Sequence, residues 1–181
     1  KNVQWHNSGA EALGEICKEI ILRKRKRNSL NLLLPGFFCG QTLRFLRCLD
    51  IRFYFYAIGN DLRPNIDDIE NKLNNTDFDI ILLVHYFGKN FNFKKIKKLS
   101  NLKKTLIVED CAHLVSPHIK NDFIGDILIF CPHKLFPVPK IALTINKKDI
   151  RHLKVSLEYN GPISAPIDKG TEVAKIIIAK K

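Results

Sequence analysis

An aspartate and a lysine draw attention first, because each lies at the end of an apolar stretch of strand length. Asp110 closely follows the apolar run at residues 106–108, and Lys134 closely follows the run at residues 127–130. A carboxylate at the end of a buried strand is costly unless a cation meets it. A lysine in a desolvated pocket readily loses its charge and becomes an amine that reacts with carbonyl groups.

Two interpretations of this pair are open. Asp110 and Lys134 would form a simple buried ion pair if their strand ends are neighbours. They would equally serve to hold pyridoxal phosphate, with the lysine as the Schiff base and the aspartate keeping the pyridine nitrogen protonated. The protonated ring would accept the electrons of a carbanion, and the same lysine would then move the proton as base and acid.

The order of the predicted elements indicates how such groups would meet. Apolar residues at helical spacing predict helices over residues 10–27 and 41–49, from residue 66 onward, and over 93–102. Short apolar runs predict strands at residues 30–34, 51–56, 79–85, 105–108, 127–130 and 141–145. Strands that are apolar on both faces and alternate with helices indicate an α/β fold, a three-layer α/β/α domain with a mostly parallel sheet.

In a parallel sheet, ligands bind beyond the carboxyl ends of the strands. Three successive strands are followed there by polar side chains: His85, then Glu109, Asp110 and His113, then Cys131, His133 and Lys134. Strand neighbours alternate faces, so Glu109 is expected to face away from Asp110, and His133 away from Lys134. For His85, a packed and hydrogen-bonded histidine is as good an interpretation as a site residue.

Five short stretches resemble motifs of the DegT/DnrJ/StrS-type sugar aminotransferases, which have the aspartate-aminotransferase-like fold. The stretches are NSGAEAL at residues 7–13, LLPGFFC at 33–39, VHYFG at 84–88, VEDCAH at 108–113, and GDI at 125–127 with FCPHK at 130–134. They occur in the family's order, and the resemblance covers about residues 7–150. It implies the large domain of a transferase that depends on pyridoxal phosphate.

The resemblance also implies roles for single residues around the cofactor ring. Lys134 would form the Schiff base, and Asp110 would pair with the pyridinium nitrogen. His113 would lie near the ring face or its phenolic oxygen. Phe38 or Cys39 would flank the ring, and the alignment favours Cys39.

The phosphate of the cofactor would lie at the start of the first helix. Ser8, Gly9 and Ala10 would offer backbone N–H groups there, since a helix N-terminus attracts anions. Cys131 takes the place of a phosphate-binding serine and would be the weaker ligand.

The sequence departs from the family pattern in two places. Lys140 and Ile141 follow Pro139 where the family usually has two glycines, and Ala10 stands where a hydroxyl residue is common. Glycines allow close backbone approach or unusual dihedral angles, so the pair must be accommodated in another way. We expect residues 1–150 to form the cofactor-binding large domain. Residues 151–181 are expected to connect it toward a small C-terminal domain that is largely absent.

The function that the resemblance implies is transfer of an amino group, commonly from glutamate, to the keto group of a nucleotide-linked sugar. Such chemistry belongs to polysaccharide biosynthesis, although relatives include dehydratases. Members of this fold usually form homodimers in which the partner completes the cofactor pocket. The alternative from another class is a degenerate, non-catalytic relative that serves as a binding or regulatory module.

A third hypothesis, nucleic-acid binding, comes from charge alone. The 181 residues contain 30 Lys+Arg and 18 Asp+Glu, a net charge of +12, and residues 23–27 are all basic. A second basic group occupies residues 94–104. No aromatic residues alternate with these charges, as stacking on bases would require. We interpret the runs as solvated helix ends and do not expect nucleic acid as a partner.

The cysteine count and the absence of long apolar runs suggest a compartment. The five cysteines are an odd number without a C-x-x-C pair, which favours a reducing, cytoplasmic environment over disulfides or a zinc site. They are expected to be small buried hydrophobic residues. No apolar run approaches the roughly 20 residues of a membrane helix, so no membrane association is expected.

Overall fold

The computed structural model describes residues 3–24, 29–99, 105–114, 123–146, 153–159 and 174–180. Within them, one sheet consists of β1 (Val3–His6), β2 (Leu30–Pro35), β3 (Ile51–Tyr56), β4 (Ile80–Val84), β5 (Leu106–Asp110), β6 (Ile127–Phe130) and β7 (Ala142–Asn146). The α-helices are α1 (Gly9–Arg23), α2 (Gly40–Leu46), α3 (Ile66–Asn75) and α4 (Lys94–Lys97). Short 3-10 helices, η1 (Tyr86–Gly88) and η3 (Pro132–Lys134), follow β4 and β6.

The sheet is mostly parallel, as predicted. Its strand order is β1-β7-β6-β5-β4-β2-β3, and the five strands from β6 to β3 run in the same direction. Only β7 runs the other way, antiparallel to both β6 and β1. The parallel strands therefore bring their carboxyl ends to one edge of the sheet.

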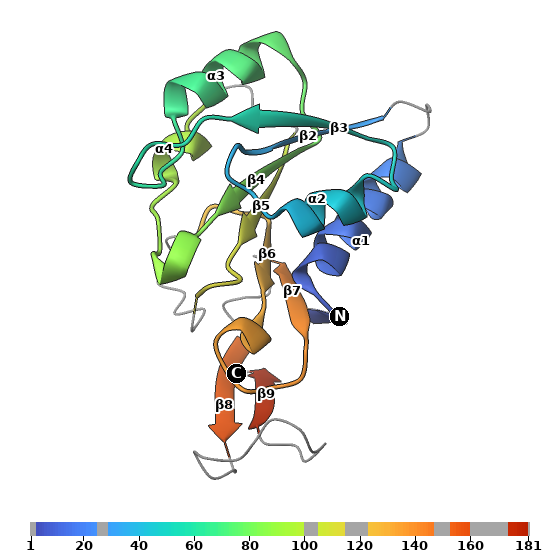
Figure 1. Ribbon diagram of the computed structural model, residues 1–181, viewed down its shortest axis with the longest axis vertical. Helices are drawn as coiled ribbons and strands as arrows, with labels where there is room; N and C mark the ends of the chain where they lie inside the picture. Colours follow the sequence, from blue (N-terminus) through green and yellow to red (C-terminus); the bar gives the residue numbers. More distant parts are fainter. Residues whose placement is uncertain are drawn as a thin grey trace.

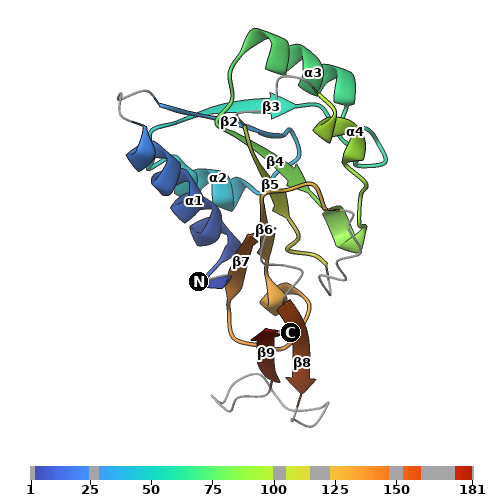
Figure 2. The same cartoon turned by 180° about the vertical axis from the view of Figure 1, so that it is seen from behind.

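Helices cover both sides of this sheet and complete the three layers. Figure 1 shows α1 and α2 together on one side, while α3 and α4 lie on the other, and Figure 2 shows the same division from behind. The central strand β4 is buried at all five positions. Two-sided burial explains why the strands read as continuous apolar runs rather than as alternating patterns.

The start of α1 is set by a reciprocal cap. The Ser8 hydroxyl accepts the N–H of Glu11 at 3.2 Å, and the Glu11 carboxylate accepts the N–H of Asn7 at 2.6 Å. This arrangement satisfies backbone donors that have no partner inside the helix. Residues Ala12, Leu13 and Ile16 then anchor α1 to the core, so the first turn is held firmly at the edge of the sheet.

The structure differs from the predicted elements at both ends of the chain. β1 was not predicted, and neither were β8 (Leu153–Tyr159) and β9 (Ala174–Lys180), which pair as a separate antiparallel sheet. The helix predicted over 10–27 ends at Arg23, and the described part of the one over 93–102 is the single turn α4. None of the described helices is long and apolar enough to span a bilayer.

Part of the basic run at residues 23–27 is structurally paired. Arg23 forms an ion pair with Glu19, and the Lys24 ammonium lies 2.6 Å from the Asp79 carboxylate. Residues 25–27, with Lys103 and Lys104 of the second basic group, lie outside the described residues. The described part of the run therefore agrees with the interpretation as a helix end.

Candidate active site

The register of the parallel strands brings the predicted polar residues to one edge. Asp110 is the last residue of β5 and is opposite Val84 on β4 and Ile129 on β6. Lys134 ends η3, the turn that directly follows β6. The carboxyl ends of neighbouring strands thus carry the aspartate and the lysine, as the sheet topology predicted.

Asp110 is half-buried and only partly satisfied. Its Oδ1 accepts the backbone N–H of Ala112 at 2.9 Å. Within the described part of the chain, Oδ2 has no hydrogen-bond partner. The carboxylate therefore keeps an acceptor oxygen available at the edge of the sheet.

Lys134 has an exposed side chain rather than the desolvated one expected from the sequence. Its charge nevertheless reaches the other predicted residues. The pKa of His113 is lowered by burial and then by the Lys134 ammonium, while Asp110 acts in the opposite direction. The pKa of Cys39 is lowered chiefly by the backbone N–H of Thr42 at the start of α2, with a smaller contribution from Lys134. The charge of Lys134 therefore acts on both His113 and Cys39, and Asp110 also acts on His113.

The predicted phosphate residues come together. An added Cβ at Gly9 would lie 2.8 Å from the Cys131 sulfur, closer than real Cβ atoms approach, so any larger residue there would force one of the two to shift. Burial raises the pKa of Cys131 to about 11, and the charge of Asp110 acts in the same direction. The Gly9 N–H and Lys134 lower it, so the amide at the start of α1 faces the sulfur. In the described residues, the neighbouring N–H of Ala10 has no partner.

The two residues predicted to flank the ring differ in position. Phe38 is half-buried and packs against the core, whereas Cys39 is exposed and precedes α2. Cys39 is thus the exposed one of the two, and the charge of Lys134 makes a small contribution to lowering the pKa of its thiol. The expectation of buried cysteines is correct for Cys17, Cys111 and Cys131 and wrong for Cys39 and Cys48, which lie on the surface.

His113 is held by the turn after β4. Its ring stacks on Phe87, with centroids 5.8 Å apart and an interplanar angle of 8°. The Phe87 N–H also donates a long hydrogen bond of 3.4 Å to His113 Nδ1. Gly88, the next residue, has a φ of +77°, which explains the glycine of the VHYFG motif.

Tyr86 is a neighbour of the site that sequence reasoning missed. Its hydroxyl donates to the Phe37 carbonyl, and the two rings lie 5.7 Å apart. Burial raises the pKa of Tyr86, and the nearby charge of Asp110 raises it further. Its place directly after His85, at a strand end, was the available signal.

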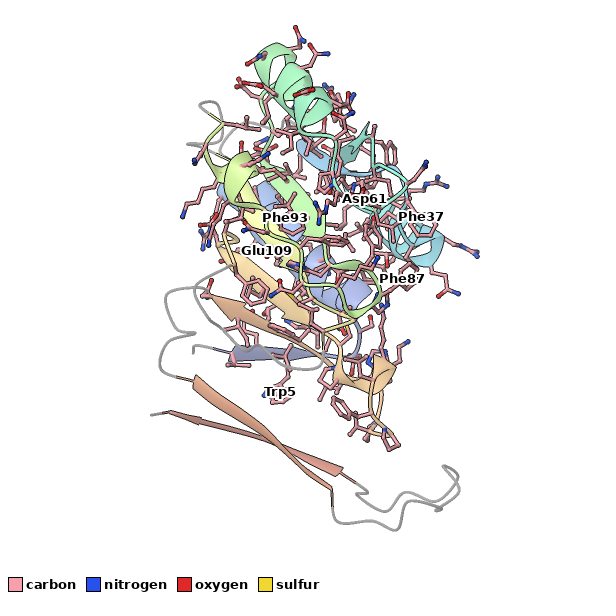
Figure 3. All side chains as sticks on the ribbon, turned by 90° about the vertical axis from the view of Figure 1, so that its left-hand side faces the viewer. Trp5, Phe37, Asp61, Phe87, Phe93 and Glu109 are labelled. Atoms are coloured by element: carbon pink, nitrogen blue, oxygen red, sulfur yellow. The ribbon has the colours of Figure 1, made fainter. Side chains whose placement is uncertain are left out.

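His85 and Glu109 belong to a separate, fully buried cluster. The His85 Nε2–H donates to Glu109 at 2.7 Å, and His85 Nδ1 accepts the Phe91 N–H at 3.0 Å. Glu109 also accepts the backbone N–H groups of Ile124, at 2.6 Å, and of Gly125. In Figure 3, Glu109 and Phe93 lie apart from Phe37 and Phe87. Glu109 thus faces away from Asp110, as predicted, and His85 is a packed histidine.

The Lys140-Ile141 pair is accommodated by ordinary backbone geometry. Among described non-glycine residues, only Leu62 and Phe87 have a positive φ. The His133 ring holds the backbone of Ile141, with Nδ1 lying 2.7 Å from its carbonyl oxygen and 3.3 Å from its nitrogen. His133 therefore faces this turn rather than the lysine's surroundings, as predicted. No left-handed glycine is needed here.

Comparison with known proteins agrees with this geometry. Residues 54–131 match the model of the DegT/DnrJ/EryC1/StrS aminotransferase family. Residues 133–181 match a second model, penicillin-binding protein 5, C-terminal domain. The first strand in that range, β7, pairs with β6 and β1 and so lies within the seven-stranded sheet. No curated protein matches the chain in sequence.

Solved structures share the fold at low identity. GDP-4-keto-6-deoxy-D-mannose-3-dehydratase of E. coli, with bound hydrated PLP, is 19% identical with a TM-score of 0.66, covering 84% of this chain and 41% of that one. The histidinol-phosphate aminotransferase of Clostridium acetobutylicum is 15% identical with a TM-score of 0.60, covering 83% and 47%. The PLP-bound C-S lyase of Staphylococcus hominis is 11% identical with a TM-score of 0.59, covering 83% and 43%.

The chain thus spans less than half the length of these structures. The family match includes Asp110, His113 and Cys131, whereas Lys134 and the residues at the start of α1 lie outside it. It confirms the resemblance seen in the sequence motifs. Residues 54–131, less than half of the chain, thus match the model of the DegT/DnrJ/EryC1/StrS aminotransferase family, and the chain shares the fold of solved structures that bind pyridoxal phosphate.

Proposed function

We propose that this chain is the cofactor-binding part of a pyridoxal-phosphate enzyme that transfers an amino group, from glutamate, to the keto group of a nucleotide-linked sugar. The observation that carries the proposal is a convergence at one edge of the sheet. Asp110, with an available acceptor oxygen, lies there together with the charge of Lys134 and the contact between Gly9 and Cys131.

The donor set fits pyridoxal phosphate. A pyridinium N–H needs an anionic acceptor, which Asp110 offers through Oδ2. A phosphate needs backbone donors. In the described residues the first turn of α1 offers the unpartnered N–H of Ala10, beside the Gly9 N–H that faces the Cys131 sulfur, and the helix dipole favours an anion there. The tight contact of Gly9 with Cys131 brings the end of β6 to these amides.

When bound, the cofactor supplies an electron sink for the carbanion formed at the substrate. Asp110 would hold the proton on the ring nitrogen. Lys134 would be the amine that attaches the cofactor, and its exposed side chain would then carry protons to and from the substrate carbon. Cys131, with its pKa raised to about 11, stays a neutral thiol and does not repel the phosphate.

A second copy of the chain is the expected partner at this edge. Phe37 is 56% exposed and Phe87 is 66% exposed, and both contact Tyr86 near the site. Apolar side chains exposed beside a polar site are typical of a surface that a partner covers. We therefore propose a homodimer in which the partner completes the pocket. The five free cysteines support a reducing compartment such as the cytoplasm.

The test begins with the purified chain and added pyridoxal phosphate. Its visible spectrum is recorded, the adduct is reduced with borohydride, and the labelled peptide is mapped. We expect the label on Lys134 and its loss in Lys134→Ala. The matched control is Lys140→Ala, which removes another exposed lysine from the same segment and should leave the label in place.

Other outcomes separate the alternatives. Label scattered over surface lysines would favour the non-catalytic relative. Specific labelling at Lys134, without amino transfer from glutamate to any keto-sugar nucleotide, would instead favour other chemistry with the same cofactor. A dehydratase reaction is then the next assay, because a 3-dehydratase of a GDP-linked sugar shares this fold.

A further inference from the structure

The turn after β4 contains an unusual backbone conformation at Phe87. Its φ is 50° and its ψ is 41°, the left-handed region that side chains other than glycine rarely adopt. Such a conformation costs on the order of 1–3 kcal/mol and persists only where the surroundings favour it. Burial of the Phe87 ring does not explain it, because the side chain is 66% exposed.

What the left-handed conformation achieves is a double contact with His113. The Phe87 ring lies nearly parallel to the imidazole, at 8°, and the Phe87 N–H points to His113 Nδ1 at 3.4 Å. One residue thus supports both the face and one nitrogen of the same ring. Gly88 continues the turn against the His113 backbone, where an added Cβ would lie 3.5 Å from the carbonyl oxygen.

The contact also determines the tautomer of His113. A nitrogen that accepts an amide N–H must carry a lone pair, so in the neutral ring the proton is on Nε2. Two charged groups act on the ring, Lys134 from the turn after β6 and Asp110 from β5, and burial adds to the effect of Lys134 in lowering the pKa of His113. Within the described residues, Nε2 has no hydrogen-bond partner.

We propose that Phe87 is a positioning residue for His113, holding its ring plane and its neutral Nε2–H tautomer, so that Nε2–H would be available to the phenolic oxygen near which the family resemblance places this ring. The identity of that acceptor rests on the proposed function. The positioning itself depends only on Phe87 and His113. The strained backbone is retained because a relaxed one would carry the Phe87 ring and N–H away from His113.

The first test uses the chain without cofactor. Nitrogen-15 NMR of the imidazole nitrogens reports the tautomer of His113, and the ring-current shift of its carbon-bound protons reports the Phe87 stack. Phe87→Asn is the main variant, because asparagine tolerates the left-handed backbone and keeps the N–H but lacks the ring. Phe87→Tyr keeps the ring and is the rescue. Leu62→Asn is the matched control, since Leu62 is the other described left-handed side chain, with a φ of 67°.

We expect Phe87→Asn to abolish the ring-current shift of His113 and to free its ring plane, whereas the Nε2–H tautomer should persist because the backbone N–H of residue 87 remains. Phe87→Tyr and Leu62→Asn should leave both signals as in the parent chain. For the monomeric chain, the unfolding midpoint of Phe87→Asn should not fall, because the change relieves backbone strain at a position that is exposed in the single chain. An unchanged ring-current shift in Phe87→Asn, or a mixture of His113 tautomers in the parent chain, would overturn the proposal.

The second test adds pyridoxal phosphate. We expect Phe87→Asn to weaken its binding by about fivefold to tenfold, the scale of one hydrogen bond to a charged group, with a shift of the absorption band that Phe87→Tyr restores. Unaltered affinity and spectrum in Phe87→Asn would overturn the donation to the cofactor. If the parent chain binds no pyridoxal phosphate, the proposed function fails, whereas the NMR result still decides the positioning of His113.

Discussion

Two carboxylates next to each other on β5, Glu109 and Asp110, have opposite environments. Glu109 is fully buried, and its oxygens accept His85 and two backbone N–H groups. Asp110 is half-buried, with one oxygen on a single backbone N–H and the other without a partner in the described residues. The strand alternation that separates them therefore separates a closed polar cluster from an open one.

The difference shows how buried charge is used in this fold. A buried carboxylate is tolerated only when its hydrogen bonds are complete, and Glu109 meets that condition by joining the ends of β4 and β5 to the segment before β6. Gly125 is part of the cluster, since an added Cβ there would lie 3.0 Å from the Glu109 side chain. The incomplete set around Asp110 is left for a ligand.

The largest expected effect is a loss of stability when the buried His85–Glu109 cluster is disrupted. Glu109→Leu leaves the His85 N–H and two backbone N–H groups buried without acceptors, so the free energy of unfolding should fall by about 3–5 kcal/mol. Urea denaturation measures it. The double variant His85→Leu/Glu109→Leu should recover part of the loss. A fall below about 1 kcal/mol for Glu109→Leu would mean that the cluster is not a structural element.

At Asp110 we expect the opposite: a small change in stability and a large loss of cofactor binding. Asp110→Asn keeps the side-chain shape and the contact with the Ala112 N–H, so the free energy of unfolding should change by less than about 1 kcal/mol. Binding of pyridoxal phosphate, followed by absorbance, should weaken by about 10–100-fold, because the ring nitrogen loses a charged acceptor. A stability loss as large as that of Glu109→Leu would remove the distinction between the two carboxylates.

The contact between Gly9 and Cys131 can be tested where the phosphate of the cofactor is proposed to bind. Gly9→Ala places a methyl group 2.8 Å from the Cys131 sulfur, and overpacking of this kind costs about 1–3 kcal/mol. Cys131→Ala creates space, so the double variant should be more stable than the sum of the two single effects predicts. Thermal unfolding of the four proteins gives the coupling. Strict additivity would mean that the two residues do not touch.

The smallest effect is expected from pH. The pKa of His113 is lowered in the folded chain, so between that pKa and the unfolded value of about 6.5 the unfolded state binds more protons. Stability should therefore be complete above that range and decrease as the pH falls through it. Burial also lowers the pKa of His6, so His6 changes the pH dependence of stability in the same direction. Unfolding of His113→Gln in urea between pH 7.5 and 5 should show a weaker dependence than the parent chain.

Strand and helix patterns in the sequence determined the layered fold and most of its elements. The runs at 127–130 and 51–56 became β6 and β3 with the predicted bounds. β6 is apolar throughout because it is almost wholly buried, whereas the edge strand β3 was predicted from its β-branched and aromatic residues. β1 was not predicted because it has only four residues, of which none is fully buried and the middle two are exposed, so no strand pattern forms. β8 and β9 lie in a stretch that was interpreted as a connection.

For the candidate site, the sequence indicated which residues carry the chemistry. Asp110 and Lys134 follow strands whose carboxyl ends had to share an edge, and alternation along β5 already turned Glu109 away. The short motifs around them were enough to suggest the family that residues 54–131 match. Apolar spacing predicts the individual strands and helices, and their alternation along the chain predicts parallel strands, so both can be derived without coordinates.

Only the tertiary structure decided which side chains meet. The contact of Gly9 with Cys131 and the stack of Phe87 on His113 join residues that are far apart in the chain. The exposure of Lys134 likewise depends on how the elements pack around it. The same holds for His85 and Glu109, whose hydrogen bond separates a structural cluster from the open edge. Such contacts depend on packing between elements and on single backbone angles, such as the positive φ of Phe87, which no periodic pattern in the sequence encodes.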